Sequence, residues 1–170
     1  MPYRHRLATR EDLPAIVGIY NHAVLEKAST CDVEPVSTAS RQAWFLASDP
    51  RRHPVWVGHE SCDPDTVTGY LTIDPFLNGR PGYDATSDIA LYLHPDHRGR
   101  GQGAHLLDAA MAHAPDLGAR TLATTIFASN EASLRLFRSR GFQEWGRLPG
   151  VADLGGGVVH DVVFVGRAVP

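Results

Sequence analysis

The sequence lacks the features that mark proteins of oxidising compartments, membranes and nucleic-acid complexes. Its 170 residues include only two cysteines, Cys31 and Cys62, and no C-x-x-C pair, so we expect free thiols. It has no long apolar run, no repeat and no apolar signal core in residues 1–12, which predicts a cytoplasmic location. The net charge is only −3, so no basic field favours nucleic acid or a membrane as a partner.

The composition is typical of one globular domain. Hydrophobic residues make up 43% of the chain and charged residues 21%, and the length of 170 residues predicts a single domain, residues 1–170, with a substantial core. The nine histidines are scattered along the chain. The nearest two, His94 and His97, lie in a predicted loop without further ligands, so no metal site is expected.

The stretch from Leu91 to Met111 is the centre of the prediction. It begins with an apolar run, is interrupted at Pro95, passes through a turn with three glycines and becomes apolar at helical spacing. The residues that would share the apolar face of the helix are Leu106, Leu107, Ala110 and Met111. The pattern predicts a strand, a glycine-rich turn and a helix that begins at about Gly103.

This turn has the chemistry of a pyrophosphate-binding cradle. Gly99, Gly101 and Gly103 let the main chain approach a ligand closely. The free N–H groups and the positive dipole end of the following helix favour a bound anion, and the side chains of Arg98 and Arg100 can add positive charge. A glycine-rich turn without a ligand is the alternative, although a plain turn needs only one or two glycines.

Three phosphate-binding patterns can be compared with this turn. A Walker P-loop needs Lys after its last glycine, where this chain has Ala104. A dinucleotide fingerprint needs an acidic residue at the end of the next strand, where this chain has Thr124 and Thr125. The third pattern, R-x-x-G-x-G, fits residues 98–103 and follows an L-x-P sequence at residues 93–95.

The rest of the chain predicts an α+β fold with a mixed sheet and about four helices. The predicted strands are Tyr3–Ala8, Val55–Val57, Val67–Ile73, Ser87–Leu93, Thr121–Phe127, Phe142–Leu148 and Val158–Val165. The predicted helices are Glu11–Glu26, Ser37–Ala47, Gly103–Ala114 and Asn130–Arg140. A glycine-rich loop, Gly150–Gly157, is expected between the last two strands. This order does not have the regular alternation of a Rossmann fold.

The R-x-x-G-x-G turn and its preceding L-x-P resemble the coenzyme A pyrophosphate motif of the GNAT superfamily of N-acetyltransferases. Residues 130–142 also resemble that family's N-x-x-S-x-x-L-[aromatic]-x-x-x-G-F helix. Within the superfamily, the sequence is most similar to the phosphinothricin and L-amino-acid (methionine sulfone/sulfoximine) acetyltransferase group. The stretches that carry the similarity are Tyr20-Asn21, residues 32–36 (DVEPV), Trp44-Phe45, Arg80 with Tyr83, residues 91–101, residues 130–142 and residues 161–164 (DVVF).

The resemblance implies a GNAT-like domain with a mostly antiparallel seven-stranded sheet, acetyl-CoA as co-substrate and a homodimer. It also implies that the main chain of residues 91–93 pairs with the pantetheine arm, and that one of its N–H groups holds the oxyanion. The expected coenzyme contacts are Leu91, Tyr92, Leu93, Arg98, Gly99, Arg100, Gly101, Gln102, Gly103, Ala104, Asn130 and Ser133.

Acetyl transfer to an amine requires a base, because amines are mostly protonated near neutral pH. Asp88, near the start of the central strand, is the candidate catalytic residue; similar proteins usually have Glu there, so the shorter Asp suggests a water relay. A solvated Asp at a strand end is the alternative. Phe137 stands where many relatives have Tyr or His, so another group or water protonates the leaving thiolate, or it leaves unassisted.

The resemblance also suggests how the acceptor is held. The expected substrate-binding residues are Cys31, Asn78, Arg80, Tyr83 and Asp88. Arg80 could hold an α-carboxylate through a bidentate pair, although an exposed loop arginine is the alternative. Relatives often have an aromatic residue at position 31 and a second Arg at position 78, so the pocket is expected to differ and phosphinothricin should not be assumed.

The expected function is acetyl-CoA-dependent acetylation of the primary amine of a small molecule, an amino acid or an analogue. Two alternatives stay open at this point. One is a regulatory module that binds the coenzyme and has lost catalysis. The other is an acetyltransferase that acts on protein termini or ribosomal proteins.

Overall fold

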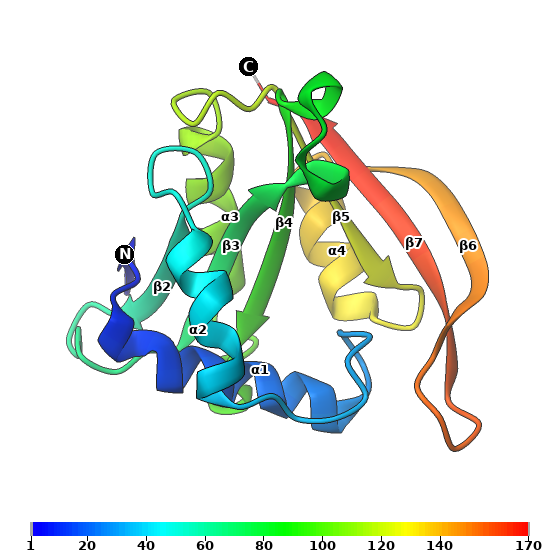
Figure 1. The fold of residues 1–170 in the computed structure, drawn as a ribbon, viewed down its shortest axis with the longest axis horizontal. Helices are drawn as coiled ribbons and strands as arrows, with labels where there is room; N and C mark the ends of the chain where they lie inside the picture. Colours follow the sequence, from blue (N-terminus) through cyan, green and yellow to red (C-terminus); the bar gives the residue numbers. More distant parts are fainter. Residues whose placement is uncertain (1, 170) are drawn as a thin grey trace.

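The computed structural model describes residues 2–169, which form a seven-stranded sheet and four α-helices (Figure 1). The strands are β1 (Tyr3–Leu7), β2 (Val55–Glu60), β3 (Gly69–Pro75), β4 (Thr86–Leu93), β5 (Thr121–Phe127), β6 (Gln143–Asp153) and β7 (Val159–Ala168). The helices are α1 (Leu13–Glu26), α2 (Thr38–Ala47), α3 (Gln102–His113) and α4 (Glu131–Ser139). The prediction of an α+β fold with a mixed sheet is confirmed.

The strands lie in the order β1-β2-β3-β4-β5-β7-β6. All neighbouring strands are antiparallel except β4 and β5, which are parallel. The parallel pair follows from the connection through α3, because a parallel neighbour requires a long crossover. This crossover places the glycine-rich turn directly after β4.

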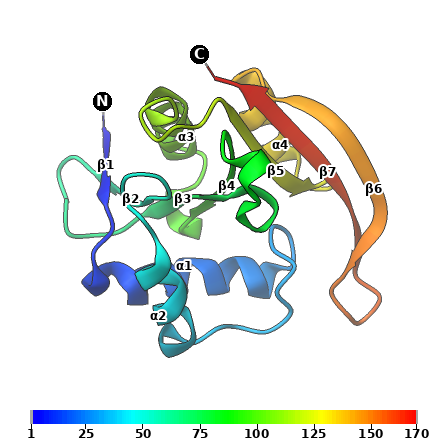
Figure 2. The ribbon, with the colours of Figure 1, turned by 45° about the horizontal axis from the view of Figure 1, so that its top comes forward.

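The helices cover the two faces of the sheet in pairs (Figure 2). One face packs against α3 and α4 through Leu71, Ile89, Leu106, Leu134 and Phe137. The other face packs against α1 and α2, with Val57 and Tyr70 of the sheet meeting the apolar sides of both helices. Each fully buried side chain of this kind contributes about 1.5–3 kcal/mol to folding. Among residues 2–169, no helix combines the length and apolar character needed to cross a bilayer.

Capping contacts explain why α2 and α4 lie close to the boundaries predicted for them. The hydroxyl of Ser37 accepts the N–H of Ser40 at 3.1 Å, so it caps the first turn of α2. The amide oxygen of Asn130 accepts the N–H of Ser133 at 3.1 Å and does the same for α4. Gly141 ends α4 with φ of +77°, a conformation that favours glycine.

The expected loop at Gly150–Gly157 is partly wrong. Strand β6 continues to Asp153, and the register with β7 shifts between Leu148 and Ala152, where Gly150 has φ of +62°. A bulge of this kind lets a strand continue through a glycine that appears in sequence to break it. The β6–β7 hairpin consequently extends past the body of the molecule at one end (Figure 1).

Candidate active site

The edge of β4 that faces β5 is mostly unpaired. The two strands pair only from Thr86 to Asp88 on β4 and from Thr121 to Ala123 on β5. Beyond that point they diverge, as Figure 1 shows, toward the end of the sheet where α4 begins. The main-chain groups of residues 89–93 on this edge can therefore pair with an extended ligand, as an added strand would.

The glycine-rich turn after β4 is open. Gly99 and Gly101 have φ of +72° and +91°, and a Cβ at either position would meet no other atom within 4 Å. Gly103 serves packing instead, because a Cβ there would lie 3.2 Å from Leu136 of α4. The first N–H groups of α3 have no partner within their own helix, so they are available to an anion at this turn. The residues present fit a pyrophosphate.

The polar side chains of this turn have different surroundings. Arg98 donates to both carboxylate oxygens of Glu26 on α1 at 2.9 Å, and to the carbonyl of Leu93 at 3.2 Å. Arg100 is exposed and forms no hydrogen bond or ion pair within residues 2–169. The Gln102 side chain is fully buried and donates to the Thr68 hydroxyl, so Gln102 can offer a ligand its main-chain N–H alone.

The predicted contacts on α4 are partly occupied by the protein itself. Asn130 caps the helix and also donates to the carbonyl of Ala28 at 3.3 Å, which ties α4 to the loop after α1. The Ser133 side chain is half-buried nearby. Phe137 is buried against Phe142, with ring centroids 5.0 Å apart, and therefore belongs to the core.

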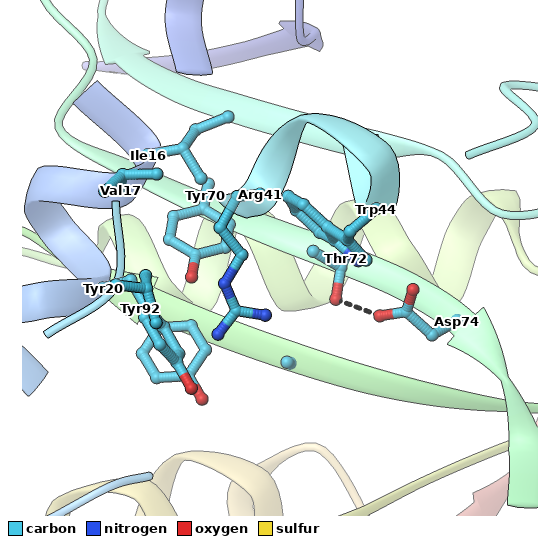
Figure 3. A pocket seen from close by; sticks show the side chains of 11 residues that line it. Ile16, Val17, Tyr20, Arg41, Trp44, Tyr70, Thr72, Asp74 and Tyr92 are labelled. Carbon is cyan, nitrogen blue, oxygen red and sulfur yellow. Dashed lines mark hydrogen bonds between the residues drawn. The ribbon is translucent and has the colours of Figure 1, made fainter. Parts of the chain in front are cut away.

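On the opposite face of β4, a cavity of about 140 Å³ lies between the sheet and helices α1 and α2 (Figure 3). It is lined by Ile16, Val17, Tyr20, Val36, Arg41, Trp44, Tyr70, Thr72, Asp74, Ala90 and Tyr92. The guanidinium of Arg41 and the carboxylate of Asp74 both face the cavity (Figure 3). Aromatic walls with opposite charges suit a small polar molecule that carries both signs of charge.

A hydrogen-bond network orients Arg41. Asp32 accepts a 2.8 Å bond from Arg41 and a 2.7 Å bond from the Tyr20 hydroxyl, and the guanidinium lies 4.7 Å from the Tyr20 ring centroid. Burial is the main cause that raises the pKa of Tyr20, so the phenol stays protonated and can donate. Asn21 exchanges two hydrogen bonds with the main chain of Val36, at 2.8 and 2.9 Å. Tyr20 and Asn21 thus hold the DVEPV stretch as the cavity wall.

Asp88 lies directly across the strand pair from Asp74, two register positions beyond the Thr72–Ala90 pair of the cavity wall and on the same face of the sheet. Its side chain is exposed at the surface, while the protein atoms packed around the carboxylate still desolvate it in part. Partial burial and then the charge of Asp74 raise the pKa of Asp88 to about 6, against a weaker opposing effect of the Ile89 N–H. A carboxylate in this range is still mostly ionised at neutral pH and can accept a proton.

The predicted acceptor residues, Asp88 included, lie outside the cavity lining. Asn78 (φ of +64°), Arg80 and Tyr83 belong to the exposed loop between β3 and β4, where Tyr83 packs on Phe76 at 5.5 Å between ring centroids. The Arg80 side chain forms no hydrogen bond or ion pair among residues 2–169, while its main-chain carbonyl accepts the N–H of Tyr83 at 2.8 Å. Cys31 is exposed beside Asp32, and its pKa is raised mainly by burial.

Most of the cavity lining is absent from the site residues predicted from the sequence, including the polar residues Arg41, Thr72 and Asp74. A signal for two of them was present, because Thr72 and Asp74 are polar residues at alternate positions of a strand whose other residues are mostly buried. Arg41 precedes Trp44 by three residues, so both lie on one side of α2.

Histidines that are distant in sequence also meet in the fold. His5 and His105 approach to 3.1 Å between ring nitrogens, and His113 lies with its ring centroid 5.8 Å from that of His5. In the described part of the chain, no group of three or more His, Cys, Asp or Glu side chains could hold a metal ion.

A free strand edge, an open glycine turn at a helix N-terminus and a carboxylate on the same strand together define a class of protein, the acyl-CoA-dependent acyltransferases. Comparisons with known proteins agree. The model of the acetyltransferase (GNAT) family matches residues 17–142. YwnH of Bacillus subtilis (strain 168) is 38% identical over 162 residues, which cover 95% of this chain and 96% of that protein.

Two further relatives carry informative names. The L-methionine sulfoximine/L-methionine sulfone acetyltransferase of Salmonella typhimurium (strain LT2) is 35% identical, over 86% of this chain and 83% of that protein. A GNAT superfamily phosphinothricin acetyltransferase from Sinorhizobium meliloti, solved in complex with acetyl-CoA, superposes with a TM-score of 0.91 at 28% identity, covering 99% of this chain and 89% of that one. The chain belongs to the GNAT family of acetyltransferases, and it is an N-acetyltransferase with acetyl-CoA as co-substrate.

Proposed function

We propose that this enzyme acetylates the primary amine of a small molecule, an amino acid or an analogue, by direct attack of the amine on acetyl-CoA. One observation carries the proposal. A single strand, β4, joins a free edge for an extended ligand, a carboxylate near its start and an open anion-binding turn at its end. The names of the relatives, which are acetyltransferases of methionine sulfoximine, methionine sulfone or phosphinothricin, support this acceptor class.

In this proposal, main-chain groups bind the coenzyme and a side chain takes the proton of the acceptor. Main-chain N–H groups of residues 99–104 and the Arg100 side chain bind the pyrophosphate, and the edge of residues 91–93 pairs with the pantetheine arm. When bound, the coenzyme supplies an acetyl thioester. One N–H of the β4 edge stabilises the charge that develops on the carbonyl oxygen. Asp88, directly or through one water, takes the proton that the ammonium must lose before attack.

The proton donor for the leaving thiolate is not Phe137. Its ring is buried and has no exchangeable proton. Since a thiol has a pKa of about 8.5, the thiolate is a fair leaving group and takes its proton from water.

We assign the acceptor's carboxylate to Arg41. Its guanidinium lies in the cavity lining and has donors beyond the one that binds Asp32, whereas Arg80 lies outside that lining. The aromatic side chains of Tyr20, Trp44 and Tyr92 give the remaining walls of the acceptor pocket. Arg80 remains the second candidate for binding the acceptor's carboxylate, and variants of both arginines test the choice.

The test is thiol release from acetyl-CoA with a panel of amines that includes L-methionine analogues, aromatic amino acids and polyamines. We expect turnover with at least one α-amino acid. Binding of acetyl-CoA without turnover of any amine would instead favour a regulatory module that has lost catalysis. Turnover of peptide N-termini alone would favour a protein acetyltransferase.

We also propose a homodimer that uses the outer strand β6. This strand is an edge of the sheet and exposes Trp145, Leu148 and Val151, an arrangement that natural proteins usually pair or protect. Light scattering should report twice the monomer mass, and the double change Leu148→Glu with Val151→Glu should reduce it. A wild-type monomer at the concentration of the assay would contradict this proposal.

A further inference from the structure

Asp74 and Asp88 form a pair of like charges across the strands β3 and β4. They are direct register partners, so their Cβ atoms are about 4.5–5.5 Å apart on the same face of the sheet. Like charges placed directly opposite one another destabilise a strand pair. Within residues 2–169, neither carboxylate forms an ion pair with a basic side chain. The fold therefore carries an electrostatic cost that no cation offsets.

The orientation of Asp74 is fixed. The hydroxyl of Thr72, on the same face two residues earlier, donates to the Asp74 carboxylate at 2.5 Å (Figure 3). Thr72 is only 3% exposed, so its position is held by the core. Asp74 is therefore an oriented carboxylate that lines the cavity, and it lies next to the candidate base Asp88.

Among the charged side chains near this face of the sheet, Asp74 is the one that lies closest to Asp88. On α2, Arg41 faces the cavity but pairs with Asp32. In the loop before β4, Arg80 and Asp84 are exposed and contact neither carboxylate.

On the other side of Asp88, β5 presents an uncharged residue, Ala123, as its register partner. After partial burial, the charge of Asp74 is the next cause that raises the pKa of Asp88 to about 6.

We propose that Asp74 is a positioning residue of the acceptor site, which acts through Asp88 and makes it a stronger proton acceptor for the incoming ammonium. The inference rests on the proposed function. The ammonium gives one proton to the Asp88 carboxylate, which becomes a neutral acid, and the amine nitrogen keeps the lone pair that forms the new C–N bond. Neutralising Asp88 relieves its repulsion with Asp74, and this relief favours the proton transfer.

The first experiment compares pH profiles of kcat/KM for the wild type, Asp74→Asn and Asp74→Glu. In the wild type, activity should fall as the pH drops through about 6, where Asp88 becomes protonated. In Asp74→Asn, this acid limb should shift to lower pH by about half a unit or more, and the plateau kcat should fall about two- to threefold. Asp74→Glu keeps the charge and should restore the acid limb toward that of the wild type.

The second experiment measures the same coupling without catalysis. The carboxyl carbon of Asp88, followed by ¹³C NMR during a pH titration, should titrate at lower pH in Asp74→Asn than in the wild type. The signal is assigned by its loss in Asp88→Asn, and acetyl-CoA binding in each variant checks the fold.

These experiments separate the two proposals. An acid limb and an Asp88 titration that are equal in the wild type and Asp74→Asn would overturn the role of Asp74. So would a glutamate variant that behaves like the asparagine variant. Absence of turnover with every amine would count against the proposed function, and the NMR titration would then decide the inference by itself.

Discussion

The proposed coenzyme end and the proposed acceptor end of the active site are built in different ways. The coenzyme end consists of one continuous segment, residues 89–104, and its working groups are mostly main-chain N–H and C=O groups. The acceptor end is assembled from side chains on α1, the loop after it, α2, β3 and β4, which are separate parts of the chain. Binding by main-chain groups depends on the local backbone conformation, which glycine and proline residues indicate in the sequence. A pocket built from side chains depends instead on which strands become neighbours in the fold.

This comparison predicts that changes at the two ends affect different quantities. Changes at the turn should weaken acetyl-CoA binding, and changes on the cavity face should alter turnover or the use of the acceptor.

The largest effect is expected for Asp88→Asn. Without a base to take the ammonium proton, turnover of the preferred amine should fall about 10²- to 10⁴-fold. The dissociation constant of acetyl-CoA should not change, because Asp88 lies on the cavity face of β4. Steady-state kinetics and calorimetry measure the two quantities. Asp84→Asn, which changes an exposed loop carboxylate, is the matched control, and full activity in Asp88→Asn would remove Asp88 as the base.

Gly101→Ala should act on the coenzyme end. At φ of +91°, an L-residue carries backbone strain of about 1–2 kcal/mol, which would be relieved by distorting the turn. The affinity for acetyl-CoA should fall about tenfold if most of this strain energy is subtracted from the free energy of binding. Gly82→Ala is the control, because Gly82 has no positive φ and open space at its Cβ. Equal affinities of the two variants would argue against a pyrophosphate at this turn.

Arg41→Gln should act on the acceptor end. The KM for α-amino acids should rise about tenfold, as expected when a charge-assisted hydrogen-bonded pair is lost. The KM for the corresponding amine without a carboxylate should stay close to the wild-type value. Arg80→Gln tests the residue that the sequence favoured. If Arg80→Gln shows the larger and carboxylate-dependent change, the acceptor's carboxylate lies at the loop and not in the cavity.

The smallest effects should distinguish the two arginines of the turn. Arg100→Ala should weaken acetyl-CoA binding a few-fold and make the affinity less sensitive to salt, because an exposed charge that contacts a phosphate is screened. Arg98→Ala should mainly lower the free energy of unfolding, by no more than about 1 kcal/mol, because the ion pair of Arg98 with Glu26 is partly exposed. Glu26→Gln should reproduce the loss of stability. A larger loss of coenzyme affinity in Arg98→Ala would reverse the assignment.

The sequence by itself predicted the elements and a coenzyme-binding turn after the central strand. Periodicity, the caps at Ser37 and Asn130, and the glycines around the turn predicted the order of strands and helices, because each of these signals acts within a few residues. It misplaced the end of β6, where a glycine bulge lets the strand continue. Asp88 could be named because a similar family has an acidic residue there, and not from spacing.

Only the tertiary structure shows which side chains line the cavity that we propose for the acceptor. The register of β3 against β4 put Asp74 opposite Asp88, and the packing of α2 on the sheet brought Arg41 to the cavity and left Arg80 outside it. It also placed Arg98 against Glu26 and buried the Gln102 side chain among residues of the sheet. Contacts between segments that are tens of residues apart depend on how the elements pack together, and no local pattern of residues records that packing.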